Sequence, residues 1–265
     1  MSEDMLLVEK KDYVGTLAFN RPERKNALSP ELLVKMHLQL EEWARGDEVR
    51  CLIITGGGDR SFSSGFDIGS IPTDVDPEME KILREHNPLE LALNGVRNFP
   101  YPTIAMLNGY AFGAGLNMCV CCDMRIAADD VKIGMPPAKL GLIYHPEGLR
   151  QFVEALGFAK TRELFFTART FVPGEVRELG VMDHIVPRDN LREYTYDLAA
   201  TIAKNAPLSL KGMKRILNMM GNTAALEGDD LLEAEQLIRD SFNSEDLKEG
   251  QMAFLEKRTP NFTGK

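Results

Sequence analysis

Three short, almost wholly apolar runs constrain the fold of this chain most. They are VRCLIIT at 49–55, PTIAML at 102–107 and MRIAA at 124–128. Near-continuous apolar runs of this length are typical of strands that are covered on both faces. Helical stretches separate them, such as the apolar series from Leu32 to Trp43. The pattern predicts an α/β core with strands that are at least partly parallel.

Weaker signals place elements near the start of the chain. Residues 5–19 read as two short strands around a turn at Lys11-Asp12. Ser29 can cap a helix whose first position is Pro30. A helix is also expected over about 77–98.

The second half of the chain changes character after residue 190. Residues 131–133 still read as a strand, and Pro146 suits the first position of a helix. Beyond 190, four amphipathic helical segments follow one another with no strand signal between them. We therefore expect a core domain over 1–190 and a helical subdomain over 191–265.

Composition excludes several classes of function. A net charge of −9 argues against bulk nucleic-acid binding, which needs a basic face. No apolar run approaches the ~18 residues that span a bilayer, and no secretory signal is expected from the acidic start of the chain.

The cysteines are spaced poorly for disulfides, and no histidine stands near them at zinc-ligand spacing. We expect Cys51, Cys119, Cys121 and Cys122 to be small buried side chains in a reducing cytoplasm, and we expect no metal site.

Two loops rich in small residues each follow a predicted strand. SFSSGFDI comes after CLIIT, and NGYAFGAGLN comes after TIAML. Gly113-Ala114-Gly115 stands where a helix must begin, and the first amides of a helix form a ready anion site. A free amide at the Gly65-Phe66 turn would complete an oxyanion hole. Glycines that merely allow tight turns and close packing are the alternative.

Longer segments carry a family resemblance. FSSGFDI, PTIAMLNGYAFGAGLNMCVCCDMRIAA and PPAKLGL, in this order and spacing, closely resemble the crotonase superfamily, that is, the enoyl-CoA hydratase/isomerase family. NRPERKNALS resembles its first CoA-contacting loop, and FLEKRTPNFTGK its C-terminal end. The resemblance implies a crotonase-like spiral of ββα units with a C-terminal helical trimerisation region. It also implies an acyl-CoA substrate with no separate cofactor, and homotrimers or hexamers.

The resemblance also implies roles for particular residues. The backbone amides of Phe66 and Ala114 map to the oxyanion hole, which holds the thioester oxygen as it gains enolate charge. Arg24 or Lys25 would meet a CoA phosphate as a charge-assisted contact, unless both are solvated surface charges. The implied CoA- and substrate-binding residues are Arg24, Lys25, Ala27, Ser64, Gly65, Asp67, Ile68, Gly113 and Tyr144.

The chain departs from the hydratase pattern at two positions. Typical hydratases of the family use two glutamates to activate and position one water. The corresponding positions here are Asn117 and Pro137. Asparagine takes no proton at neutral pH, and proline has no polar side-chain group. The two-carboxylate hydration mechanism is therefore missing from its usual places.

The remaining candidates lie in YHPEG, residues 144–148. Glu147 stands close to the single acid of some isomerase branches, but a glutamate there also simply complements a helix dipole. His145 is a candidate base or a hydrogen-bonded histidine. Tyr144 would line the acyl pocket or donate a hydrogen bond. Asn117 would orient the thioester or satisfy a buried carbonyl.

These observations favour an enoyl-CoA isomerase-type double-bond shift, for which one base such as Glu147 suffices. A hydratase or hydrolase with a displaced acid is the alternative enzyme. A non-catalytic acyl-CoA-binding protein is the alternative from another class. A serine peptidase is disfavoured because no histidine shows a clear partnership with Ser63 or Ser64.

Overall fold

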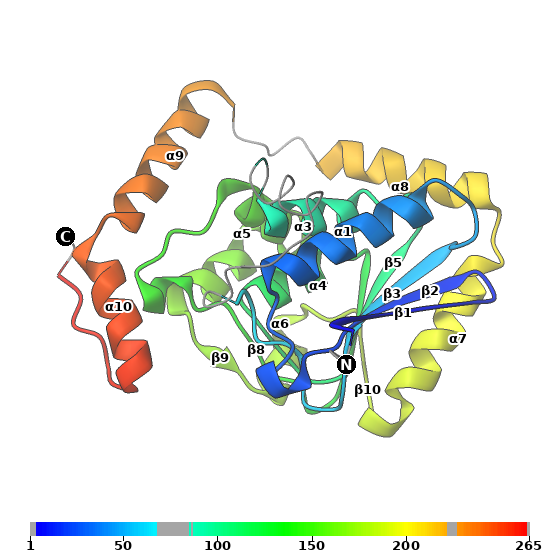
Figure 1. The fold of residues 1–265 in the computed structure, drawn as a ribbon, viewed down its shortest axis with the longest axis horizontal. Helices are drawn as coiled ribbons and strands as arrows, with labels where there is room; N and C mark the ends of the chain where they lie inside the picture. Colours follow the sequence, from blue (N-terminus) through cyan, green and yellow to red (C-terminus); the bar gives the residue numbers. More distant parts are fainter. Residues whose placement is uncertain (1–3, 68–84, 86, 222–226, 264–265) are drawn as a thin grey trace. The chain divides into compact units, whose positions relative to one another are not determined.

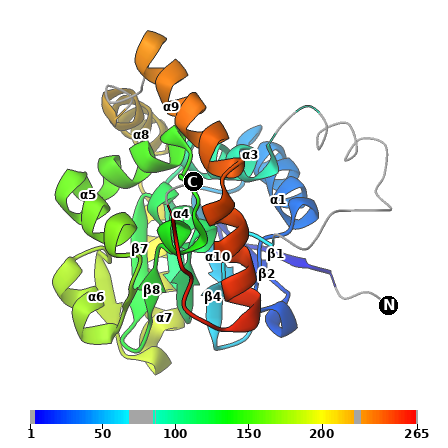
Figure 2. The same cartoon turned by 90° about the vertical axis from the view of Figure 1, so that its left-hand side faces the viewer.

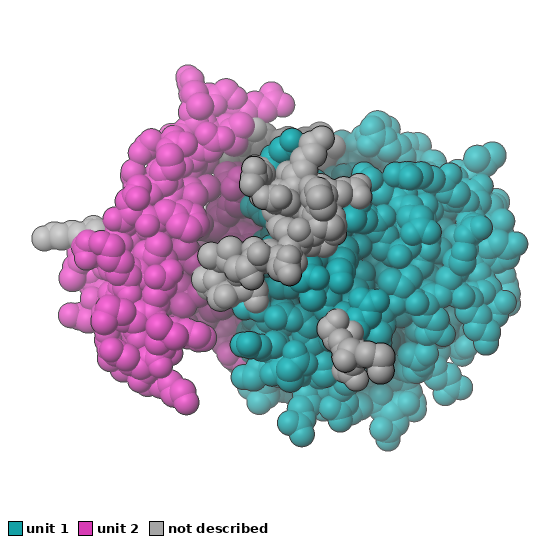
Figure 3. Space-filling view, in the orientation of Figure 1, with its two compact units in different colours: residues 1–133, 171–220 teal, residues 134–170, 221–265 magenta. Residues whose placement is uncertain are grey.

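The computed structural model describes residues 4–67, 85, 87–221 and 227–263, which divide into two compact units (Figures 1 and 3). Unit 1 comprises residues 1–133 and 171–220, and unit 2 comprises residues 134–170 and 221–265. Residues 134–170 thus group with the C-terminal helices rather than with the strands that precede them. The two domains expected on either side of residue 190 remain a prediction.

A six-stranded sheet forms the core of unit 1 (Figure 1). Its strands are β1 (Leu6–Lys11), β2 (Val14–Phe19), β3 (Cys51–Gly56), β5 (Thr103–Leu107), β7 (Met124–Ala128) and β10 (His184–Val186). They lie in the order β1-β2-β3-β5-β7-β10; β1 and β2 pair antiparallel and all other neighbours pair parallel. Every residue of β3 and β5 is buried, as their apolar runs predict. The predicted α/β core is confirmed.

A second sheet carries the two glycine loops. It has the order β4-β6-β8-β9, and the unit boundaries fall inside β8 (Ile133–Gly134) and β9 (Thr170–Phe171). β4 (Ser61–Ser63) and β6 (Tyr110–Phe112) pair parallel. The strand expected from residue 131 starts later, because the Val131 N–H donates to the Ala128 oxygen and so belongs to the turn after β7.

Six α-helices of the described chain lie in unit 1. They are α1 (Pro30–Ala44), α3 (Pro88–Arg97), α4 (Ala114–Cys121), α6 (Pro173–Leu179), α7 (Leu191–Ala203) and α8 (Pro207–Gly221), whose last residue belongs to unit 2. α1 and α3 lie side by side in both views (Figures 1 and 2), and α7 contacts β2, β3, β5 and β7. The short helices η1 (Pro22–Arg24) and η3 (Arg188–Asn190) lie in connections.

Two predicted helix starts can be checked in unit 1. The Ser29 hydroxyl accepts a hydrogen bond from the Leu32 N–H (3.3 Å), so α1 begins as predicted. The helix expected over about 77–98 is described as α3 from its cap at Asn87 onward. Its expected beginning falls largely outside the described residues.

Unit 2 is helical. It contains η2 (Pro137–Leu140), α5 (Pro146–Thr167), α9 (Gly228–Phe242) and α10 (Glu245–Glu256). α10 packs closely on η2: a Cβ on Gly250 would lie 2.7 Å from the Leu140 backbone. The four helices predicted after residue 190 are confirmed as α7 to α10. Within the described parts of the chain, no helix is long and apolar enough to cross a bilayer.

Candidate active site

The two glycine loops meet in unit 1 because β4 and β6 are paired neighbours. Ser61 pairs with Tyr110 and Ser63 with Ala111, so both strands deliver their following loops to the same edge of the sheet. Gly65 has a φ of +105°, and a Cβ there would lie 2.9 Å from the Phe112 oxygen and 3.6 Å from the Ala114 nitrogen. Only glycine fits this approach. The two predicted glycine loops therefore lie together at one edge of the sheet.

The Phe66 N–H points away from Leu28, the residue whose backbone pairs with Phe66. Leu28 forms an isolated parallel bridge with Phe66, in which the Leu28 N–H donates to the Gly65 oxygen (2.9 Å) and the Asp67 N–H donates to the Leu28 oxygen (3.0 Å). In a parallel bridge the bonds on one side come from the residues flanking the bridged one, so its own N–H faces the other side.

The Ala114 amide is the first of helix α4. Gly113, with a φ of +52°, is the N-cap, and its oxygen accepts the first helical bond from the Asn117 N–H (3.0 Å). The amide of the first helical residue precedes that bond and has no acceptor within the helix. Among the described residues, neither the Ala114 N–H nor the Phe66 N–H has a hydrogen-bond acceptor. Two donors with no acceptor in the described chain thus stand on adjoining loops.

The predicted CoA-contacting segments also meet. The Ser64 N–H donates to the Lys25 oxygen (3.0 Å), which aligns the loop of Arg24, Lys25 and Ala27 with the loop after β4. The side chains of Arg24 and Lys25 are exposed. Asp67 forms an ion pair with Arg21 (3.0 Å). Ile68 lies outside the described residues.

Two side chains that we did not single out hold these loops. Asn26 is fully buried with a φ of +53°, and its amide donates to the oxygens of Gly57 (2.9 Å) and Ser61 (2.8 Å). Arg21 donates to the Ala27 oxygen (2.8 Å). The signal for Asn26 was present in the sequence, because asparagine tolerates the left-handed conformation in a polar connector.

Asn117 and Pro137 are the two positions at which the family resemblance implies the hydratase glutamates. Asn117 is fully buried in α4, and its amide donates to the Cys121 sulfur (3.5 Å). Pro137, in unit 2, opens η2 and is buried. Neither position offers a group that can exchange a proton at neutral pH.

The YHPEG segment starts α5 in unit 2. Pro146 is the first helical residue, as predicted, and exposed His145 is the N-cap, whose oxygen accepts from the Leu149 N–H (3.0 Å). The Tyr144 ring packs against Phe165, with centroids 5.4 Å apart.

Glu147 is held in an ion pair within unit 2. Both of its carboxylate oxygens accept hydrogen bonds from Arg150, one of them from Nε at 2.8 Å. The Arg150 side chain is only 7% exposed and also bonds Glu154 (3.0 Å). The hydrogen bond to Glu147 raises the pKa of this guanidinium above its ordinary value. Glu147 is thus part of a paired, partly buried cluster at a helix start.

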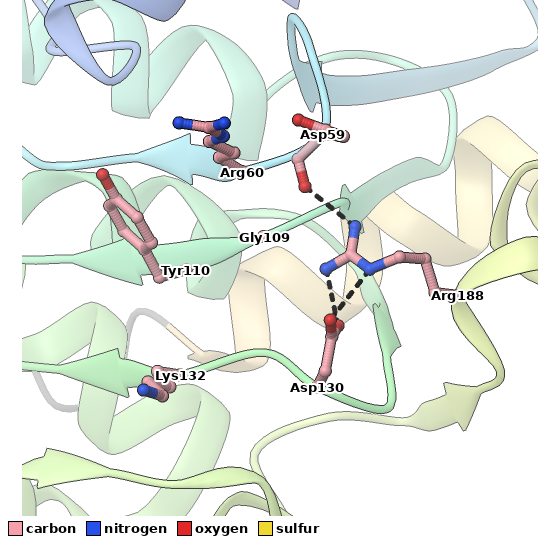
Figure 4. A pocket seen from close by; sticks show the side chains of 7 residues that line it. All are labelled: Asp59, Arg60, Gly109, Tyr110, Asp130, Lys132 and Arg188. Atoms are coloured by element: carbon pink, nitrogen blue, oxygen red, sulfur yellow. Dashed lines mark hydrogen bonds and ion pairs between the residues drawn. The ribbon is translucent and has the colours of Figure 1, made fainter.

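A polar pocket of about 330 Å³ lies at the other ends of β4 and β6 (Figure 4). Arg188 donates there to the backbone oxygens of Asp59 (2.9 Å) and Asn108 (2.7 Å), and it pairs with the Asp130 carboxylate. That pairing lowers the pKa of Asp130. None of our predicted site residues lines this pocket.

The cysteines are buried, as predicted, and burial raises the pKa of Cys51 and Cys122 to about 12. Thiols in this state are weak nucleophiles and weak metal ligands at neutral pH. No group of three or more histidine, cysteine or acidic side chains within the described ranges is arranged to hold a metal ion.

Parallel strands that end in two small-residue loops, whose amides have no acceptor among the described residues, define a class of proteins able to bind an oxyanion through the backbone. Comparison with known proteins identifies the family within that class. The family model described as "Enoyl-CoA hydratase/isomerase" matches residues 9–265. The chain therefore belongs to the enoyl-CoA hydratase/isomerase family, in the crotonase superfamily, and is an acyl-CoA-processing enzyme.

Individual relatives show the range of reactions in the family. The chain is 31% identical over 266 residues to methylmalonyl-CoA decarboxylase of Escherichia coli K12, with full coverage of both proteins. It is 30% identical over 265 residues to 2,3-dehydroadipyl-CoA hydratase of the same organism, also with full coverage. A solved methylmalonyl-CoA decarboxylase in complex with 2-nitronate-propionyl-CoA superimposes with a TM-score of 0.88, at 30% identity and full coverage of both chains.

Proposed function

We propose that the enzyme decarboxylates a CoA thioester that carries a carboxylate on its α-carbon, as methylmalonyl-CoA does. The Phe66 and Ala114 amides hold the thioester oxygen. The bond between the α-carbon and the carboxylate breaks, CO₂ leaves, and the electron pair moves into the thioester enolate. A proton from water then returns to the α-carbon and gives the acyl-CoA product.

The observation that carries this proposal is that the Phe66 and Ala114 amides are available as donors, whereas neither hydratase carboxylate stands at its usual position. Loss of CO₂ creates the enolate directly, so the reaction needs an oxyanion hole but no base to remove a proton. Asn117 and Pro137 stand at the positions that the resemblance implies for the hydratase glutamates, and Glu147 is engaged by Arg150. The similarity to methylmalonyl-CoA decarboxylases points the same way.

The remaining predicted residues have places in this proposal. The loops of residues 24–27 and 64–67 would carry the CoA moiety, with Arg24 and Lys25 near its phosphates. The space beside Gly113 is open, since nothing lies within 4 Å of the position that a Cβ would take there, and the glycine places no side chain in it. Substrate-binding roles for Tyr144 and His145, which lie in unit 2, remain predictions from the family resemblance. CoA is part of the substrate, and the reaction requires no further cofactor.

The test offers three substrates to the purified enzyme: methylmalonyl-CoA, a 3-enoyl-CoA and a 2-enoyl-CoA. Mass spectrometry in D₂O should show CO₂ loss from the first, with one deuterium in the propionyl-CoA formed. Turnover of either enoyl-CoA, together with no decarboxylation of methylmalonyl-CoA, would refute the proposal. Isomerisation that disappears in Glu147→Gln would instead support the isomerase prediction. Tight binding with no turnover would support a non-catalytic role.

We also propose that the chain self-associates, as the expected homotrimer or hexamer. Helix α8 in unit 1 exposes Leu208 (84%), Leu217 (65%) and Met220 (66%), and α10 in unit 2 exposes Leu255 (78%). Apolar side chains exposed in this number on helices indicate an interaction surface. Light scattering should give a mass at least three times 29.6 kDa, whereas a monomer would refute this proposal.

A further inference from the structure

The Arg21 guanidinium joins the backbone at Ala27 to the side chain of Asp67, the residue that follows Phe66. Arg21 donates through one nitrogen, Nη1, to the Ala27 oxygen (2.8 Å), and the same nitrogen pairs with the Asp67 carboxylate (3.0 Å). The side chains of Arg21 and Asp67 are 14% and 16% exposed. At this low exposure the pair is screened far less by solvent than a surface ion pair.

The pair sits directly beside the donor. Asp67 follows Phe66 in the chain, and its own N–H is fixed to the Leu28 oxygen (3.0 Å). Ala27 precedes Leu28. The main chain and the side chain of Asp67 are therefore both bonded to residues 21–28. These bonds hold the peptide group of Phe66 on the side opposite to the direction in which its N–H points.

Orientation is what such a donor needs. An amide stabilises a developing oxyanion only if it already points at the oxygen, because a loop that must reorganise loses that stabilisation. Phe66 stands outside any regular strand and the residue is 40% exposed, so packing of its side chain does little to fix the peptide plane.

We propose that Arg21 is a positioning residue that, through Asp67, holds the Phe66 amide in the orientation required for the oxyanion. The inference rests on the proposed role of this amide. It requires no particular reaction, because any enolate bound in the same place needs the same orientation.

The test measures binding rather than turnover. The two probes are propionyl-CoA and 2-nitronate-propionyl-CoA, whose nitronate spreads a negative charge as an enolate does. The wild-type enzyme should prefer the nitronate. In Arg21→Met that preference should fall about tenfold to a hundredfold, the range expected for a misplaced group, while propionyl-CoA affinity changes little.

Arg188→Met is the matched control. Arg188 also joins a carboxylate to backbone oxygens, but next to residues that precede β4 and β6 rather than in the loops that follow them (Figure 4). It should lose folding stability yet keep the wild-type preference. If Arg21→Met and Arg188→Met weaken both probes alike, Arg21 is merely structural and the inference is overturned.

Two further results separate the possibilities. If the wild type shows no preference for the nitronate, the proposed role of the amides and this inference fall together. If the preference is present and survives in Arg21→Met, this inference falls alone. Should Arg21→Met not fold, Asp67→Asn removes the same ion pair with an isosteric side chain. It should lower the preference in the same direction, and an unchanged preference would overturn the inference.

Discussion

Ala114→Pro removes one hydrogen-bond donor and almost nothing else. Ala114 is the first residue of α4, so its N–H has no acceptor in the helix, and proline is favoured at that position. The ψ of Gly113 is −122°, outside the helical region that a following proline disfavours. The free energy of unfolding should therefore change by less than about 1 kcal/mol. The proline ring also places a carbon where the amide hydrogen was.

The expected catalytic effect is large. Losing one oxyanion-hole donor costs about 3–4 kcal/mol of transition-state stabilisation, or roughly a 100- to 1,000-fold lower kcat. Methylmalonyl-CoA turnover is measured in Ala114→Pro and in Ala114→Gly, which keeps the N–H. The glycine variant should stay within about threefold of the native rate, because the donor is retained. A proline variant within about tenfold of the glycine variant would refute the assignment of this amide.

Three further predictions concern other parts of the chain. Glu147→Gln should keep decarboxylation within about tenfold of the native rate while lowering the free energy of unfolding in urea by about 1–3 kcal/mol, because Arg150 loses one of its carboxylates; loss of turnover would contradict it. Asn26→Ala should cost about 2–3 kcal/mol of stability, since buried carbonyls lose their donor, and a cost below about 1 kcal/mol would contradict it. The hydrogen bond from Arg258 lowers the pKa of Glu249 from 4.5 to about 2, so its stabilisation is present above pH 4.5 and is lost as the pH falls toward 2. Melting curves between pH 5 and about 2.5 should therefore converge for the native protein and Glu249→Gln, and a constant difference would contradict this.

The parts of the fold that were predicted are those with a strong local cause. Runs such as 51–55 and 103–107 are apolar at every position but their ends, which leaves few structures other than a buried strand. Ser29-Pro30 carries its own capping chemistry. In contrast, β9 and β10 have two and three residues, too few for any hydrophobic period to appear, and neither was predicted.

The same distinction between local and long-range causes applies to the candidate site. The glycine loops could be found because their small residues are contiguous in the sequence. The contacts that orient them could not, because Arg21 and Asp67 are far apart in the chain and meet only when the loops pair. The Glu147–Arg150–Glu154 cluster is different: its spacing of three and four residues along one helix was visible in PEGLRQFVE and predicts ion pairs.

That cluster changes how Glu147 is understood. A guanidinium that is 7% exposed is costly to bury unless carboxylates surround it, and removing one of them leaves charge uncompensated. Glu147 therefore has a structural reason to occupy the helix start that is independent of any catalysis. A base for an isomerase would have to give up part of this pairing each time it accepted a proton, whereas a decarboxylase makes no such demand. The family resemblance, which makes Glu147 a candidate base, and the ion pair that holds Glu147 thus predict opposite outcomes for Glu147→Gln.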